Sequence, residues 1–274
     1  MNTIIVKKTN ISDDDFHLRN AKKSDYDLVL KEDTIVRDAD TNKIVVIFKK
    51  HAISKKAAMI GYPALMSTKS GDGLNNRGLF AGEIGKACHS YTAGYMERQG
   101  GRNPCCRAFS WNRENPKQMR KILPLLQDMD QTFKQCHPEA YHKQKRFIDT
   151  IHKDYHLPKT NYTTIQINLS VQGAYHRDKG NALDGFGCMS VLMKGRVYDC
   201  GLCLPEYRVL ADLRDRDMIM FDSHLMHGNR KGYGHGKMYK DYNRISIVAY
   251  VRERLKQCMS MKEEVIRANN KYGL

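Results

Sequence analysis

Two histidines and one aspartate are the residues of this sequence best spaced to bind a metal ion together. His176 and Asp178 lie two residues apart, just past the alternating segment 163–170, so on extended backbone their side chains point the same way. His227 follows 49 residues after Asp178, in a turn behind a hydrophobic run. Two imidazoles and one carboxylate leave three octahedral positions open, as in non-haem iron(II) oxygenases. His-x-Asp alone is weak evidence, and His224 competes with His227 as the third ligand.

A second pair of residues is suited to binding an organic carboxylate. Arg244 and Ser246 begin a β-branched segment that starts 17 residues after His227, and their spacing places them on one face of a strand. A guanidinium fork with a hydroxyl group fits the distal carboxylate of 2-oxoglutarate. An interior arginine requires such a partner, because burying an unpaired charge is costly. A salt-bridged surface arginine is the alternative.

Short strands are expected to position these residues. Alternating or β-rich segments predict strands at 163–170, 186–193, 207–212, 218–221 and 245–250, a spacing typical of a sandwich or jelly roll. A hairpin is expected over 25–50, long loops over 61–115, a helix from about 116 that Pro124 kinks or divides, a helix over 141–151 and another over 258–270.

These elements predict an α+β protein with a mainly β core. We expect one domain over 1–274, with a double-stranded β-helix (jelly roll), buttressing helices and an N-terminal β extension. Its parts are the extension 1–60, a loop-rich and helical support region 61–160, the jelly-roll core 161–255 and a C-terminal helix or tail 256–274.

The composition favours a polyanionic partner. The 46 Lys and Arg exceed the 30 Asp and Glu, which gives a net charge of +16 and suits binding to nucleic acid phosphates. We find neither an apolar run of membrane-spanning length nor a signal peptide, and expect an intracellular monomer: nuclear in a eukaryote, otherwise cytoplasmic or in the host cell of a virus. The eight cysteines are interpreted as thiols, including the Cys200-Gly-Leu-Cys203 pair, which lacks a second half-site for zinc.

The order of these motifs resembles that of the double-stranded β-helix 2-oxoglutarate oxygenases, and within them the TET/JBP group of nucleic-acid-modifying dioxygenases. The resemblance is strongest over 160–252 and looser over 28–112. It is carried by Ile165-Gln-Ile-Asn168, His176-Arg-Asp-Lys-Gly-Asn181, Leu204-Pro-Glu-Tyr207, Asp217-Met-Ile-Met-Phe-Asp222, His227-Gly-Asn229 and Asn243-Arg-Ile-Ser246.

This resemblance implies that His176, Asp178 and His227 bind Fe(II), and that Arg244, with Ser246, binds 2-oxoglutarate. Dioxygen is then the second co-substrate, and ascorbate an optional addition. Asn168 is expected beside the co-substrate and Asn181 beside the substrate. Basic residues of the flanking loops are expected to contact phosphates, among them Arg98, Arg102 and Lys231.

The expected reaction is oxidation of the methyl group of 5-methylcytosine in DNA to 5-hydroxymethylcytosine, with further oxidation open. The base would have to leave a methylated duplex to reach the metal. Hydroxylation of thymine in DNA uses the same chemistry, and a protein or small-molecule hydroxylase could share the same iron site. A non-catalytic DNA-binding module is the alternative from a different class.

Overall fold

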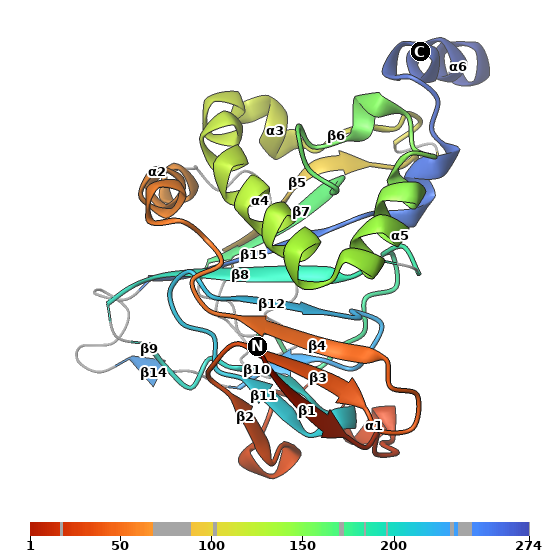
Figure 1. Cartoon of the computed structure of the whole chain (residues 1–274). Coiled ribbons are helices and arrows are strands. Elements are labelled where there is room, and N and C mark those ends of the chain that lie inside the picture. Colours follow the sequence, from red (N-terminus) through yellow and green to blue (C-terminus); the bar gives the residue numbers. More distant parts are fainter. Residues whose placement is uncertain are drawn as a thin grey trace.

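The computed structural model describes residues 1–16, 19–67, 89–100, 103–169, 173–183, 185–195, 197–230, 233–234 and 243–273. These residues form two main β-sheets, and a group of helices covers the outer face of the larger one (Figure 1). Within these ranges, no helix has the length and apolar character needed to span a lipid bilayer.

Nine strands form the larger sheet, in the order β1-β3-β4-β12-β8-β15-β7-β5-β6. They are β1 (Asn2–Val6), β3 (Thr34–Asp38), β4 (Ile44–Lys49), β5 (His89–Met96), β6 (Arg107–Ala108), β7 (Thr164–Leu169), β8 (Gly187–Lys194), β12 (Met218–Phe221) and β15 (Asn243–Tyr250). Neighbouring strands are antiparallel except for β1 and β3. The sheet therefore combines strands from both sides of the division expected at residue 60.

A smaller sheet lies against one face of the larger one. Its order is β13-β10-β11-β2, formed by β2 (Leu28–Leu30), β10 (Leu202–Leu204), β11 (Val209–Ala211) and β13 (Gly228–Asn229). Leu204 and Val209 of this sheet share a buried cluster with Phe48, Val191 and Phe221 of the larger one. Two sheets that bury apolar side chains between them form the core of a jelly roll. The predicted fold class is confirmed, although the two sheets do not close into a barrel in the described ranges.

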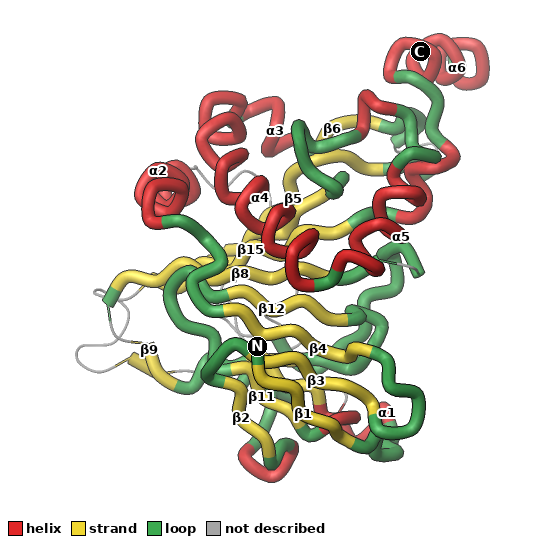
Figure 2. Tube along the Cα trace, in the orientation of Figure 1, coloured by secondary structure: helices red, strands yellow, loops and turns green. Residues whose placement is uncertain are grey.

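Helices cover the other face of the larger sheet, as the red layer in Figure 2 shows. They are α2 (Lys55–Met66), α3 (Ser110–Glu114), α4 (Pro116–Cys136) and α5 (Pro138–Ile148), while α6 (Met261–Tyr272) carries the C-terminus away from this layer. The remaining short elements are α1 (Asp13–Phe16), the strand pair β9 (Val197–Tyr198) and β14 (Tyr233–Gly234), and 3-10 turns at Lys23–Asp25, Lys153–Tyr155, Pro205–Tyr207 and Glu253–Gln257.

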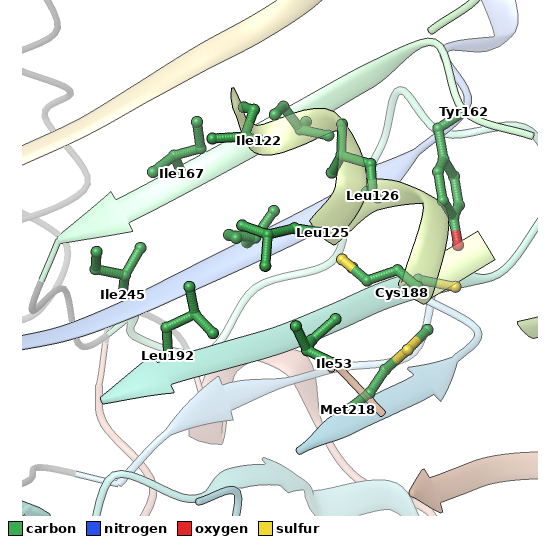
Figure 3. Close-up of a cluster of buried hydrophobic side chains, with 14 of the residues drawn as sticks. Ile53, Ile122, Leu125, Leu126, Tyr162, Ile167, Cys188, Leu192, Met218 and Ile245 are labelled. Carbon is green, nitrogen blue, oxygen red and sulfur yellow. The ribbon is translucent and has the colours of Figure 1, made fainter. Parts of the chain in front are cut away.

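The long helix α4 anchors this layer to the sheet. Its Leu125 and Leu126 are fully buried and share one apolar cluster with Ile167 of β7 and Leu192 of β8 (Figure 3). Pro124 was expected to kink or divide the helix, but α4 runs undivided from Pro116 to Cys136. The packing of the apolar face on the sheet compensates for the hydrogen bond that the proline removes.

Several elements differ from the sequence-based expectations. The hairpin β3–β4 forms as predicted, but β2 leaves it and pairs in parallel with β11 of the smaller sheet. The region 61–115, expected to consist of loops, contains the second half of α2 and all of β5. Gly61 and Pro63 inside α2, and Gly94 inside β5, are residues that normally interrupt such elements.

The cysteines also correct an expectation. Cys106 and Cys258 form a disulfide, with Cα atoms 6.0 Å apart, so the interpretation of every cysteine as a thiol was wrong for this pair. The two residues are separated by 152 positions, and no local pattern marks them as partners. Cys200 and Cys203 are buried thiols, and no metal-binding group in the described part of the chain includes them.

Candidate metal centre

The structure brings His176, Asp178 and His227 together at one end of the two sheets. One ligand atom from each residue lies within 4.8 Å of the other two, and the His176 Nε2 and Asp178 Oδ1 atoms are 3.8 Å apart. The two histidines form an isolated antiparallel bridge, with N–H···O distances of 2.9 and 3.0 Å. This bridge fixes the spacing of the two imidazoles, which come from distant parts of the sequence.

Hydrogen bonds orient both imidazole rings. His176 Nδ1 lies 2.8 Å from the carbonyl oxygen of Ala174, and His227 Nδ1 lies 2.8 Å from that of Leu225. A carbonyl oxygen can only accept, so each Nδ1 carries a hydrogen, and Nε2 is the ring nitrogen available to a metal ion.

The carboxylate of Asp178 is held in place by its neighbours. The Asp178 backbone N–H donates to the Ser223 carbonyl at 3.0 Å. Asn181 Nδ2 donates to Asp178 Oδ2 at 3.2 Å and to Ser223 Oγ at 2.7 Å. Oδ1 thus remains directed at the histidines. His224 lies outside this cluster, because its Nδ1 is 2.8 Å from the Asp222 carboxylate.

Ion pairs from the N-terminal region brace the segment between the ligands. Arg177 donates to both Asp13 carboxylate oxygens and lies 2.6 Å from Glu206. The hydrogen bond to Asp13 raises the pKa of Arg177, so its charge is permanent. Tyr175 donates to Asp25 at 3.0 Å, and Arg19 forms a forked pair with the same carboxylate. Burial opposes ionisation of Asp25, but these hydrogen bonds lower its pKa on balance.

A cavity of about 670 Å³ opens beside the three ligands. Its apolar wall consists of Met189, Leu202, Phe221, Met226 and Val248, and its polar wall includes Gln166, Asn168, Asn229, Ser246, Tyr250 and Arg252. A space of this size accepts a small organic molecule together with part of a larger substrate.

Arg244 is the buried cation that the sequence predicted. It is 2% exposed and shares the inner face of β15 with Ser246 and Val248, which line the cavity. Arg244 Nη2 and Asn229 Nδ2 both donate to the Cys200 carbonyl, at 3.4 and 3.3 Å. The buried Nε of Arg244 has no hydrogen-bond partner among the described residues. A buried guanidinium with an open donor fits an anionic ligand.

Asn168 supports Ser246 across the sheet. The two residues are paired in the register of β7 and β15, and Asn168 Nδ2 donates to Ser246 Oγ at 3.3 Å. Ser90 Oγ in turn donates to Asn168 Oδ1 at 2.7 Å. Asn168 therefore lines the cavity and holds the Ser246 hydroxyl, while its expected place beside the co-substrate stays a prediction.

Of the three basic residues expected to contact phosphates, the structure describes one. Arg98 lies 3.1 Å from the fully buried Glu264 and also donates to the Gln257 carbonyl, so its charge is committed to the C-terminal region. The structure thus places Arg98 beside the buried Glu264 of α6, and its expected role as a phosphate contact stays a prediction. Arg102 and Lys231 lie outside the described residues.

Sequence reasoning missed the outer part of the cavity wall. Tyr250 and Arg252 continue the two-residue alternation that begins at Arg244 and Ser246, so the same periodicity could have identified them. Arg252 is held by Glu97 through bonds of 2.6 and 2.8 Å. Burial alone would lower the pKa of Arg252, but the Glu97 carboxylate raises it on balance. The alternating residues from 244 to 252 thus begin and end with an arginine, and Arg252 lines the cavity.

Comparison with known proteins places this geometry in a family. The model of the TET/JBP family, described as the oxygenase domain of the 2OGFeDO superfamily, matches residues 90–253. The chain belongs to the TET/JBP family. Its cofactor is therefore Fe(II) and its co-substrates are 2-oxoglutarate and dioxygen.

Relatives and a solved structure extend the comparison. The bifunctional helicase and thymine dioxygenase JBP2 of Trypanosoma brucei brucei (strain 927/4 GUTat10.1) is 28% identical over 253 residues, which is 90% of this chain and 22% of that protein. JBP2 of Leishmania tarentolae is 31% identical over 147 residues, which is 54% of this chain and 13% of that protein. The chain thus spans about a fifth or less of the length of these relatives. NgTET1 in complex with 5mC DNA superposes with a TM-score of 0.64 at 9% identity, covering 98% of this chain and 91% of that one, which confirms the jelly-roll fold.

The residues at the centre fit the cofactors of the family. Two neutral imidazoles and a carboxylate are a donor set for Fe(II), and the open Nε of buried Arg244 is suited to the distal carboxylate of 2-oxoglutarate. The three metal ligands line the cavity, and so does Ser246, which lies two residues from Arg244 on the same face of β15.

Proposed function

We propose that this protein hydroxylates the 5-methyl group of a pyrimidine base in DNA, with His176, Asp178 and His227 as the iron ligands and Arg244 as the 2-oxoglutarate anchor. The observation that carries the proposal is the convergence of the three ligand atoms within 4.8 Å beside a cavity of about 670 Å³. The net charge of +16 supports a polyanionic substrate, and the names of the JBP and TET relatives support DNA.

Thymine is the first base to test. The relatives that align with most of this chain are named as thymine dioxygenases, at 28% identity. The neighbour bound to 5mC DNA is 9% identical and supports the fold, so 5-methylcytosine, placed first from the sequence, becomes the second candidate. The two bases carry the same methyl group and differ at the neighbouring C4 substituent.

The chain's own residues would divide the work as follows. Bound iron supplies the activation of dioxygen, coupled to oxidative decarboxylation of 2-oxoglutarate to succinate and carbon dioxide. His176, Asp178 and His227 would hold the metal ion, while Arg244 and Ser246 would bind and orient the co-substrate. Phe221 and the other apolar residues of the cavity keep water away from the reacting methyl group. The target base must leave the duplex stack to enter, which costs a few kcal/mol that protein contacts must offset.

The test compares two DNA duplexes, each incubated with the protein, Fe(II) and 2-oxoglutarate. One duplex has thymine as its only 5-methylated base, and the other also contains 5-methylcytosine. Nucleoside mass spectrometry should show a hydroxymethyl base, and succinate should form in equal or greater amount. His227→Ala should abolish both products, because the metal loses a ligand. His224→Ala is the matched control from the same turn and should retain them, since His224 lies outside the cluster.

Two results would contradict the proposal. Succinate formation without an oxidised base in any DNA would indicate a protein or small-molecule hydroxylase. Full DNA binding by His176→Ala, together with no succinate from the unaltered protein, would indicate a non-catalytic DNA-binding module.

A further inference from the structure

Three acidic side chains in the segments that line or adjoin the cavity are paired with cations. Asp13 is paired with Arg177, and Glu97 with Arg252. Glu253, which directly follows Arg252, lies 3.0 Å from Lys256. These three carboxylates therefore add little net negative charge at the rim.

Two cations at the same place have no such partner. Lys179 directly follows the ligand Asp178, lines the cavity and is exposed. Arg254 lies two residues beyond the cavity-lining Arg252 and is also exposed. Neither side chain has a carboxylate within 4.0 Å in the described ranges, although the positive charges of Lys179 and Arg254 help to lower the pKa values of Asp13 and Glu97, respectively.

Backbone hydrogen bonds hold the two segments against each other. The Glu253 N–H donates to the Gly180 carbonyl at 3.2 Å, and the Ala182 N–H donates to the Val251 carbonyl at 2.9 Å. Between these bonds, Asn181 and Arg252 form an isolated antiparallel bridge. Lys179 and Arg254 thus extend from adjoining segments whose relative position is fixed by the same backbone that carries Asp178.

We infer that Lys179 and Arg254 form a phosphate clamp for the DNA strand whose base enters the cavity. The inference rests on the proposed function, because a base that reaches the metal brings its own phosphates to the cavity mouth. Two unpaired cations beside the mouth suit these phosphates, and released counterions favour the contact. Lys179 and Arg254 take the phosphate-binding role that was expected of Arg98, which instead pairs with Glu264.

The experiment measures binding of a thymine-containing duplex as a function of salt concentration. Lys179→Gln with Arg254→Gln should weaken binding and reduce the slope of log K against log salt by about 2, because each lost phosphate contact lowers the slope by about 1. The matched control is Arg120→Gln with Lys121→Gln. It removes one arginine and one lysine from exposed positions of α4, on the opposite side of the larger sheet from the cavity, and should leave the slope unchanged.

Two further measurements separate the clamp from the proposed function. The Lys179/Arg254 variant should still bind Fe(II) in the absence of DNA, because neither side chain supplies one of the three ligand atoms. An unchanged salt slope in that variant, or an equal decrease in the α4 control, would overturn the clamp even if the unaltered protein oxidises DNA. A reduced slope in a protein that oxidises no base would support the clamp and count against the proposed reaction.

Discussion

Asn181 connects the metal ligands to the cavity wall. Its side chain is almost fully buried and bridges the Asp178 carboxylate and the Ser223 hydroxyl, while its backbone pairs with Arg252. Outer partners of this kind orient a ligand and tune its basicity, and their loss commonly weakens metal binding by about 10- to 100-fold. Asn181 was expected to contact substrate, and its place in the cavity lining is compatible with both roles.

Replacement of Asn181 distinguishes these roles. Asn181→Ala should weaken Fe(II) binding by about 10-fold or more in the absence of DNA, because Asp178 loses the amide that holds its Oδ2. Iron affinity can be measured by competition with a chelator. Ser223→Ala is the comparison, since it leaves the amide contact to Asp178 intact and should have a smaller effect. Unchanged iron affinity with slower DNA oxidation would assign Asn181 to the substrate alone.

The ligands themselves could be predicted from sequence because their spacing follows strand periodicity. His176 with Asp178, and Arg244 with Ser246, are pairs two residues apart, and His176, Asp178 and Ser246 line one cavity in the structure. Their supporting contacts could not be predicted. Arg177, for example, reaches Asp13, which lies 164 residues away, and no local pattern encodes that partner.

The same distinction holds for the elements. Strands β7, β8, β12 and β15 were recognised because apolar residues alternate or cluster in them, whereas α2 was missed because Gly61 and Pro63 interrupt its pattern. Tertiary packing explains why α2 nevertheless forms. Gly61 is buried against Leu125 of α4, and an added Cβ would lie 2.2 Å from Leu125 Cδ1. The glycine permits the two helices to approach closely.

Because of this contact, we expect replacement of Gly61 by alanine to lower the free energy of unfolding, the opposite of its effect in an isolated helix. Gly61→Ala should destabilise the protein by about 1–3 kcal/mol through overpacking, although alanine favours an isolated helix by about 1 kcal/mol. Leu125→Ala alone should cost about 2–5 kcal/mol because it leaves a cavity. The double variant should cost less than the sum, since each change relieves the other. Urea denaturation measures all three, and increased stability of Gly61→Ala would refute the close approach.

At the scale of the whole molecule, segments near both ends of the described chain are fastened to distant parts of the sequence. The N-terminal region adds β1, β3 and β4 to the larger sheet and contributes Asp13 to the pair with Arg177. After β15, Cys258 joins Cys106, and the buried Glu264 of α6 accepts a hydrogen bond from the Cys106 N–H at 3.1 Å. The strand that carries Arg244 is thus held beyond its end by a covalent bond.

The disulfide should make stability depend on redox conditions. It closes a loop across 152 residues, so its removal by Cys106→Ser with Cys258→Ser should lower the free energy of unfolding by about 2–5 kcal/mol. Dithiothreitol should produce a similar loss in the unaltered protein and little in the double variant, as urea denaturation would show. Cys105→Ser is the control, because this neighbouring thiol is free and its replacement should preserve the response to dithiothreitol. An equal effect of the reductant on the double variant would mean that Cys106 and Cys258 are not its target, and a linked peptide in non-reducing mass spectrometry would identify the bond directly.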